Sequence, residues 1–98
     1  MSELRLKLFV AGESPRTRAA AAGLARACTE ILGHEVAIET IDVVAHPEAA
    51  DEYRILTTPT VVREAPGPRR RVTGDLRDIA QVLAALAIFP SPSPTTPS

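Results

Sequence analysis

A Thr-Pro-Thr triplet at residues 58–60 most constrains how this chain of 98 residues can fold, because it stands directly before an apolar run. An X-Pro bond takes the cis form at a cost of only about 0.5–1 kcal/mol. A cis bond here would change the direction of the chain so that it enters the β-strand predicted for the apolar run that follows. We therefore predict a structural cis-proline at Pro59.

Residues 4–32 are predicted to form a strand, a turn and a long helix. In residues 4–10, the row Leu4, Leu6, Leu8 and Val10 alternates with Arg5, Lys7 and Phe9, which is typical of a strand with at least one buried face. Ser14 offers an N-cap oxygen, and Pro15 is a favoured first residue of the helix that follows. Gly33 is predicted to end this helix. The turn before the helix contains no cysteine.

The rest of the chain continues as a single α/β domain. The expected elements are a strand at 35–43, a helix at 47–54, a hairpin of strands at 60–64 and 69–73, and a helix with Asp75 as its N-cap that ends at Phe89. The order β-α-β-α-β-β-α is the arrangement of thioredoxins. Thioredoxins carry redox cysteines in the first strand–helix turn, and this chain has Gly-Glu-Ser-Pro there. The scaffold lacks the thiols that redox chemistry requires, which favours a binding function.

Composition narrows the classes of function. The formal net charge is −1, which argues against a nucleic-acid partner. No apolar run approaches the length of about 20 residues that a membrane span needs, and no signal peptide is evident, so we expect a cytoplasmic chain. Residues 1–90 are expected to form one domain, and residues 91–98, rich in Pro, Ser and Thr, a disordered tail.

Four segments, at residues 6–12, 41–43, 54–60 and 70–76, resemble the KaiB family of circadian-clock proteins. The match runs without an evident gap from Leu4 to Ile88. The resemblance implies two possible folds. One is a ground state of order βαββααβ that assembles as a tetramer. The other is a thioredoxin-like state of order βαβαββα. The half of the chain from about Asp51 to Pro90 is the part that changes between them.

The resemblance also implies a function. KaiB in its thioredoxin-like state is a non-enzymatic adaptor that binds the N-terminal ATPase ring of KaiC and regulates its phosphorylation cycle. KaiA or a KaiB-like sensor kinase would then be a further partner or a competitor. An alternative is a KaiB-like signalling or stress-response module with another protein partner and no clock role. A residual thioredoxin-like redox or chaperone domain is disfavoured, because the thiols are missing. No cofactor is expected.

Three residues near the carboxyl end depart from the family pattern. Ala85 and Ala87 stand where the family commonly has Gly and Asp. In a helix interior these replacements would favour the helical state by about 1.5 kcal/mol together. Pro90 ends any terminal helix or strand early. We therefore predict that the thioredoxin-like state is the resting state and that the chain is a monomer in it, with a tetramer expected only for the ground state.

The resemblance assigns partner binding to Ala37 and Glu39 on the second strand, to Arg54, and to Arg70 and Arg71 before the Gly-Asp turn. Arg54 stands where the family usually has Lys, so the positive charge is kept. Glu39 stands where Lys is frequent, so the charge is reversed. For the arginines at 69–71, the alternative is a solvated hairpin end.

Other residues are weaker candidates for a functional site. Cys28 falls on the apolar stripe of the first helix and is predicted to be core; as the only cysteine, it can form no internal disulfide. His34 and His46 are too isolated to be predicted as a metal pair, and no metal site is expected. The acids Glu48, Asp51 and Glu52 are predicted to form a solvated helix face. No phosphate loop or nucleophile motif is evident, so no enzymatic activity is expected.

Overall fold

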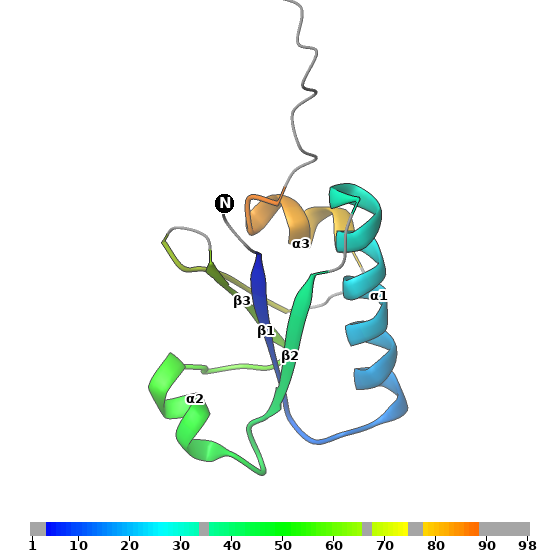
Figure 1. Cartoon of the computed structure of the whole chain (residues 1–98). Coiled ribbons are helices and arrows are strands. Elements are labelled where there is room, and N and C mark those ends of the chain that lie inside the picture. Colours follow the sequence, from blue (N-terminus) through cyan, green and yellow to red (C-terminus); the bar gives the residue numbers. More distant parts are fainter. Residues whose placement is uncertain (1–3, 34–35, 66–67, 75–77, 89–98) are drawn as a thin grey trace, which may run out of the picture.

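A four-stranded mixed sheet in the order β2-β1-β3-β4 forms the centre of the molecule (Figure 1). The computed structural model describes residues 4–33, 36–65, 68–74 and 78–88. The elements are β1 Arg5–Val10, α1 Pro15–Leu32, β2 Ala37–Asp42, α2 Pro47–Tyr53, β3 Thr60–Ala65, β4 Arg70–Thr73 and α3 Ile79–Ala85. This is the predicted order βαβαββα and not the alternative βαββααβ.

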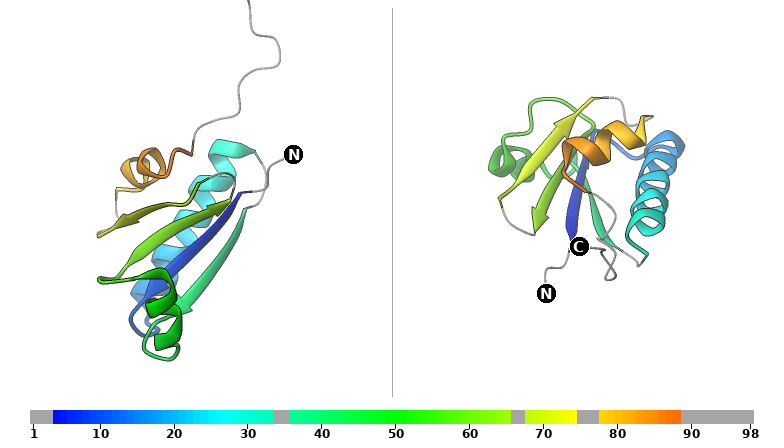
Figure 2. Two further views of the ribbon diagram at one scale, coloured as in Figure 1. Left: turned by 90° about the vertical axis from the view of Figure 1, so that its left-hand side faces the viewer. Right: turned by 90° about the horizontal axis from the view of Figure 1, so that it is seen from above.

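Strand β1 lies between a parallel and an antiparallel neighbour. It pairs in parallel with β2 and antiparallel with β3, and β3 forms an antiparallel hairpin with β4. Because side chains alternate along each strand, the sheet presents one row of residues to each face. Helices α1 and α3 cover one face and α2 covers part of the other, which the three views together make clear (Figures 1 and 2).

The larger core lies between the sheet and the helices α1 and α3. Leu6, Leu8 and Val10 of β1 meet Leu24 and Cys28 of α1, and all five are almost fully buried. The prediction that Cys28 is a core residue is confirmed. The α3 side of this core is formed by a second group of buried residues: Val61, Val82, Leu83, Leu86 and Ile88.

Helix α1 begins and ends as its sequence predicts. The Ser14 side chain accepts a hydrogen bond from the Thr17 backbone N–H at 3.1 Å, and Pro15 is the first helical residue. Gly33 follows the last turn with a φ of 77°, a conformation that residues with a side chain rarely adopt. These features depend on local backbone chemistry, which explains why the sequence alone predicts them.

The last helix differs from the prediction. Asp78 is its N-cap, accepting from the Gln81 N–H at 3.1 Å, whereas Asp75 lies outside the described residues. The helix ends at Ala85 rather than at Phe89. Ala87 follows in a left-handed conformation with a φ of 59°. The Ala87 N–H donates to the Ala84 carbonyl and the Ile88 N–H to the Leu83 carbonyl, at 3.0 and 2.9 Å.

These two hydrogen bonds form a Schellman motif. Helix α3 ends before Phe89 because of packing. The turn at Ala87 brings Ile88, 5% exposed, back onto the core beside Leu83. Ala87 is therefore not in a helix interior, and the helix-propensity argument does not apply to it. Ala85 is the last helical residue. Pro90 and the tail at 91–98 lie outside the described residues.

Candidate functional site

The turn that holds the cysteines in a thioredoxin is fixed here by a carboxylate. Asp42, the last residue of β2, accepts hydrogen bonds from the backbone N–H groups of Gly12 and Val44 at 2.8 and 2.9 Å. The bond from Gly12, followed by that from Val44, lowers the pKa of the Asp42 carboxyl. Cys28 is buried away from this turn, and burial raises the pKa of its thiol, which disfavours the reactive thiolate.

The lowered pKa of Asp42 predicts a pH-dependent contribution to stability. A carboxyl whose pKa is lower in the folded state stabilises the fold above its unfolded pKa, about 3.9, and loses that contribution as the pH falls through the folded value. We expect Asp42→Asn to be less stable than the native chain at pH 7, and the difference to shrink as the pH is lowered below about 4. Urea unfolding at several pH values measures this. Asp51→Asn, which removes a carboxylate from an exposed position of α2, is the control. A pH-independent difference for Asp42→Asn would contradict the prediction.

The proline before β3 lies at the same end of the sheet. The Thr58–Pro59 bond is cis. The Pro59 carbonyl accepts from the Gly74 N–H at 3.1 Å, and the Thr60 hydroxyl donates to the Thr57 carbonyl at 2.7 Å. The backbone around Pro59 is thus hydrogen-bonded within the chain, in keeping with a structural role.

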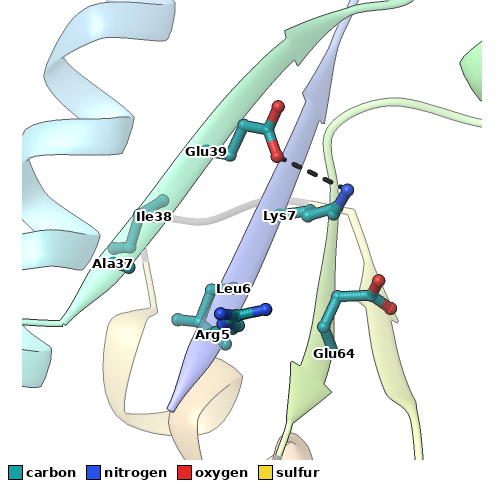
Figure 3. A pocket seen from close by; sticks show the side chains of 7 residues that line it. All are labelled: Arg5, Leu6, Lys7, Ala37, Ile38, Glu39 and Glu64. Atoms are coloured by element: carbon teal, nitrogen blue, oxygen red, sulfur yellow. Dashed lines mark ion pairs between the residues drawn. The ribbon is translucent and has the colours of Figure 1, made fainter. Parts of the chain in front are cut away.

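The face of the sheet under α2 is divided into a covered part and an open part. In the covered part, Phe9, Tyr53 and Val62 form a second buried cluster, and the rings of Phe9 and Tyr53 lie 5.1 Å apart. The open part is a cavity of about 510 Å³ on β1, β2 and β3 (Figure 3). The side chains that line it on this face are Arg5, Lys7, Ala37, Glu39 and Glu64. We call these five residues the open face.

Most charges of the open face are paired within the chain. The Lys7 ammonium lies 3.4 Å from a Glu39 oxygen and 5.1 Å from the centre of the Tyr53 ring. The Tyr53 hydroxyl, and then Glu39, raise the pKa of Lys7 although its partial burial opposes this. Glu64 accepts from the Tyr53 hydroxyl at 2.5 Å and lies 2.7 Å from Arg69 Nε. Burial, followed by the bond to Glu64, raises the pKa of Tyr53.

The residues predicted for partner binding fall in three places. Ala37 and Glu39 come together on the open face, and Arg54 stands exposed at the end of α2, on the same side of the sheet. Arg71 donates to the backbone carbonyls of Tyr53 and Arg54, at 2.6 and 3.0 Å. It caps α2, because a cation is favourable at the carboxyl end of a helix. Arg70 is the next residue along β4, so its side chain points to the opposite face.

Sequence reasoning did not single out several residues that build this face. Arg5 and Lys7 had a visible signal, since they are the polar positions of an alternating strand. Tyr53 and Glu64 had none, because they are brought together from a helix and a strand. Arg69, which the sequence groups with the arginines at 69–71, lies just before β4 and pairs with Glu64. Among the described residues, no group of three or more His, Cys, Asp or Glu side chains is placed to hold a metal ion.

The sequence of the chain is similar to those of known proteins. The family model of the KaiB domain matches residues 7–88. The chain belongs to the KaiB family. It is 38% identical over 90 residues to circadian clock protein KaiB3 of Synechocystis, covering 92% of this chain and 88% of that one. It is 44% identical over 85 residues to circadian clock oscillator protein KaiB of Synechococcus strain RCC307, covering 86% and 76%. The resemblance inferred from the sequence is confirmed.

Solved structures support the fold of this KaiB family member. The N-terminal domain of Synechococcus elongatus SasA superposes with a TM-score of 0.64 at 27% identity, covering 87% of this chain and 84% of that one. Thioredoxin 1 of Thermosipho africanus gives a TM-score of 0.63 at 18% identity, covering 85% and 90%. The thioredoxin-like fold is thereby confirmed. In the part of the chain that the structure describes, no helix is long and apolar enough to cross a membrane.

Proposed function

We propose that this chain is a KaiB-type adaptor that docks on the N-terminal ATPase ring of KaiC and regulates the KaiC phosphorylation cycle in the cytoplasm. The observation that carries the proposal is the grouping of Ala37, Glu39 and Arg54 on one side of the sheet. These residues match the partner-binding positions implied by the family, and Arg54 is exposed at the edge of the α2 side. KaiA or a KaiB-like sensor kinase would compete for the same complex.

The thioredoxin-like state is the proposed docking form, and the hydrogen bonds that hold α2 on the sheet support this. Tyr53, Glu64 and Arg71 hold α2 against the sheet through hydrogen bonds between α2, β3 and β4. All three lie in residues 51–90, the half that we propose to switch within a domain of residues 1–90. In a different order of elements, this half would form neither the buried cluster of Phe9, Tyr53 and Val62 nor the open face as they are described above. The adaptor acts as a monomer in this state, and the tetramer belongs to the ground state.

The proposed adaptor has no enzymatic role. The turn at residues 12–15 has no thiol, and the one cysteine is buried in the core. An insulin-reduction assay is expected to give no activity above buffer, because the assay requires a thiol pair.

Docking is tested by mixing the chain with KaiC from its host, with and without nucleotide, and measuring the complex by size-exclusion chromatography. We expect a complex of ring size. Arg54→Glu is expected to lower the affinity about 10-fold or more, since reversed charge at an interface creates repulsion. Arg18→Glu is the matched control, because Arg18 is an exposed arginine on α1, on the other side of the sheet. Absence of a ring-sized complex with the native chain would contradict the proposal.

A KaiB-like signalling or stress-response module with another protein partner is the second candidate. The observation that favours it is Glu39, which is exposed on the open face where the family frequently has Lys. Affinity capture by a partner other than KaiC, together with failure to bind the KaiC ring, would support this candidate over the first.

A further inference from the structure

Within the part of the chain that the structure describes, Arg5 is the one cation of the open face that forms no ion pair. Its in-register neighbour on β2 is Ala37. On β3 the register shifts between Leu6 and Arg5, so that Glu64 and Ala65 lie opposite Arg5, and Ala65 is its register partner. Among the described residues, no carboxylate lies within ion-pair distance of Arg5. Opposite charges directly across neighbouring strands stabilise a sheet, and Arg5 makes no such pair with Ala37 or Ala65.

The other charges of the open face cancel in pairs. Lys7 is in register with Glu39 and forms an ion pair with it. Glu64 is engaged twice, by Arg69 and by the Tyr53 hydroxyl. The open face holds two cations and two carboxylates, and Arg69, which lies outside it, takes up Glu64, so Arg5 has no ion pair among the described residues.

The cavity also leaves space next to Arg5. Leu6 and Ile38 contribute to its lining, but their side chains belong to the core on the opposite face. On the open side, Ala37 is the smallest lining residue and stands directly beside Arg5 (Figure 3). The small side chain leaves room for a group to approach the exposed guanidinium.

We propose that the open face receives an acidic side chain, Asp or Glu, of the docking partner and that Arg5 binds its carboxylate. This inference rests on the proposed docking function and names the chemistry that the partner presents. A guanidinium matches a carboxylate with two parallel hydrogen bonds. One guanidinium without an ion pair fits a carboxylate better than a phosphate group, which carries about −1.5 to −2 and would meet Glu39 and Glu64 at the rim.

The test is a binding series against the KaiC ring with four chains: native, Arg5→Ala, Arg5→Glu and the control Arg18→Glu. We expect affinity to fall about 5-fold or more with Arg5→Ala and about 10- to 100-fold with Arg5→Glu, while Arg18→Glu binds like the native chain. The difference between native and Arg5→Ala is expected to shrink between about 50 mM and 500 mM salt, because screening weakens a partly exposed ion pair. Ala37→Leu keeps every charge but fills the space beside Arg5, and it is expected to weaken binding as well.

The outcomes separate this inference from the docking proposal. If the native chain forms the ring complex and Arg5→Glu binds as tightly as Arg18→Glu, the carboxylate pocket is wrong and docking stands. If Arg5→Ala weakens binding equally at low and high salt, the ion pair is likewise wrong. If the native chain forms no complex, both proposals fail. Circular dichroism of each variant checks that the fold is intact, which is expected since Arg5 and Arg18 are exposed.

Discussion

Replacing Phe9 by alanine is expected to lower the free energy of unfolding by about 3–5 kcal/mol, a large part of the stability of a domain of this size. Phe9 is fully buried on the α2 side of β1, with its ring 5.1 Å from that of Tyr53 and in the same cluster as Val62. Few other apolar side chains hold α2 to the sheet. The cavity left by the ring would therefore loosen α2 as well as reduce overall stability, and the proposed docking on the KaiC ring is expected to weaken with it.

Phe9→Leu provides the control for this prediction. It keeps an apolar side chain in the same place and is expected to cost no more than about 1.5 kcal/mol. Chemical unfolding of the three chains gives the free energies directly, and the melting temperature of Phe9→Ala is expected to fall by about 12 °C or more. A loss below about 1 kcal/mol for Phe9→Ala would mean that the α2 cluster does not form in solution as described.

Replacing Leu86 by alanine is expected to cost about 2–5 kcal/mol. Leu86 is fully buried at the end of α3, where it packs with Val82, Leu83 and Ile88 against the sheet. Leu56→Ala is a matched control, because Leu56 is 93% exposed and the same substitution there removes almost no buried surface. We expect the control to change stability by less than about 0.5 kcal/mol.

The Leu86 prediction also bears on the resting state. NMR chemical shifts of the native chain over residues 78–88 are expected to show the helix α3 and not a strand as the major species. If the shifts show a strand there, or if Leu86→Ala unfolds with the same free energy as the native chain, the thioredoxin-like state is not the resting state.

The elements of the chain were largely predictable from local signals. Ser14, Pro15 and Gly33 bound α1 where the sequence places its ends, because caps act through backbone groups a few residues away. The alternation in β1 correctly separates Leu6 and Leu8 from Lys7. The end of α3 was missed, because a left-handed Ala87 is rare. Here burial of Ile88 outweighs the strain.

The candidate site was predictable only in part. Family resemblance indicates Ala37, Glu39 and Arg54, and the structure groups them on one side of the sheet. The family resemblance assigns partner binding to both Arg70 and Arg71. In the structure, their side chains lie on opposite faces of β4, and Arg71 donates hydrogen bonds to backbone carbonyls at the end of α2. No pattern in the sequence distinguishes an arginine that caps a helix from one that is free to bind a partner.

Local signals in the sequence predict the helices and strands of the thioredoxin-like order, the caps of the first helix, the proline that leads into β3 and the absence of thiols from the first turn. Each of these depends on residues close together in the chain. The pairing of charges depends on the folded chain, since Lys7 and Glu39 meet across two strands and Glu64 and Arg69 meet across the turn between β3 and β4. The fold also sets Arg5 beside Ala37 on one strand and opposite Glu64 and Ala65 on the other. Strand register follows from packing of the whole sheet, so only the paired strands reveal that Arg5 is the charge of the open face without an ion pair among the described residues.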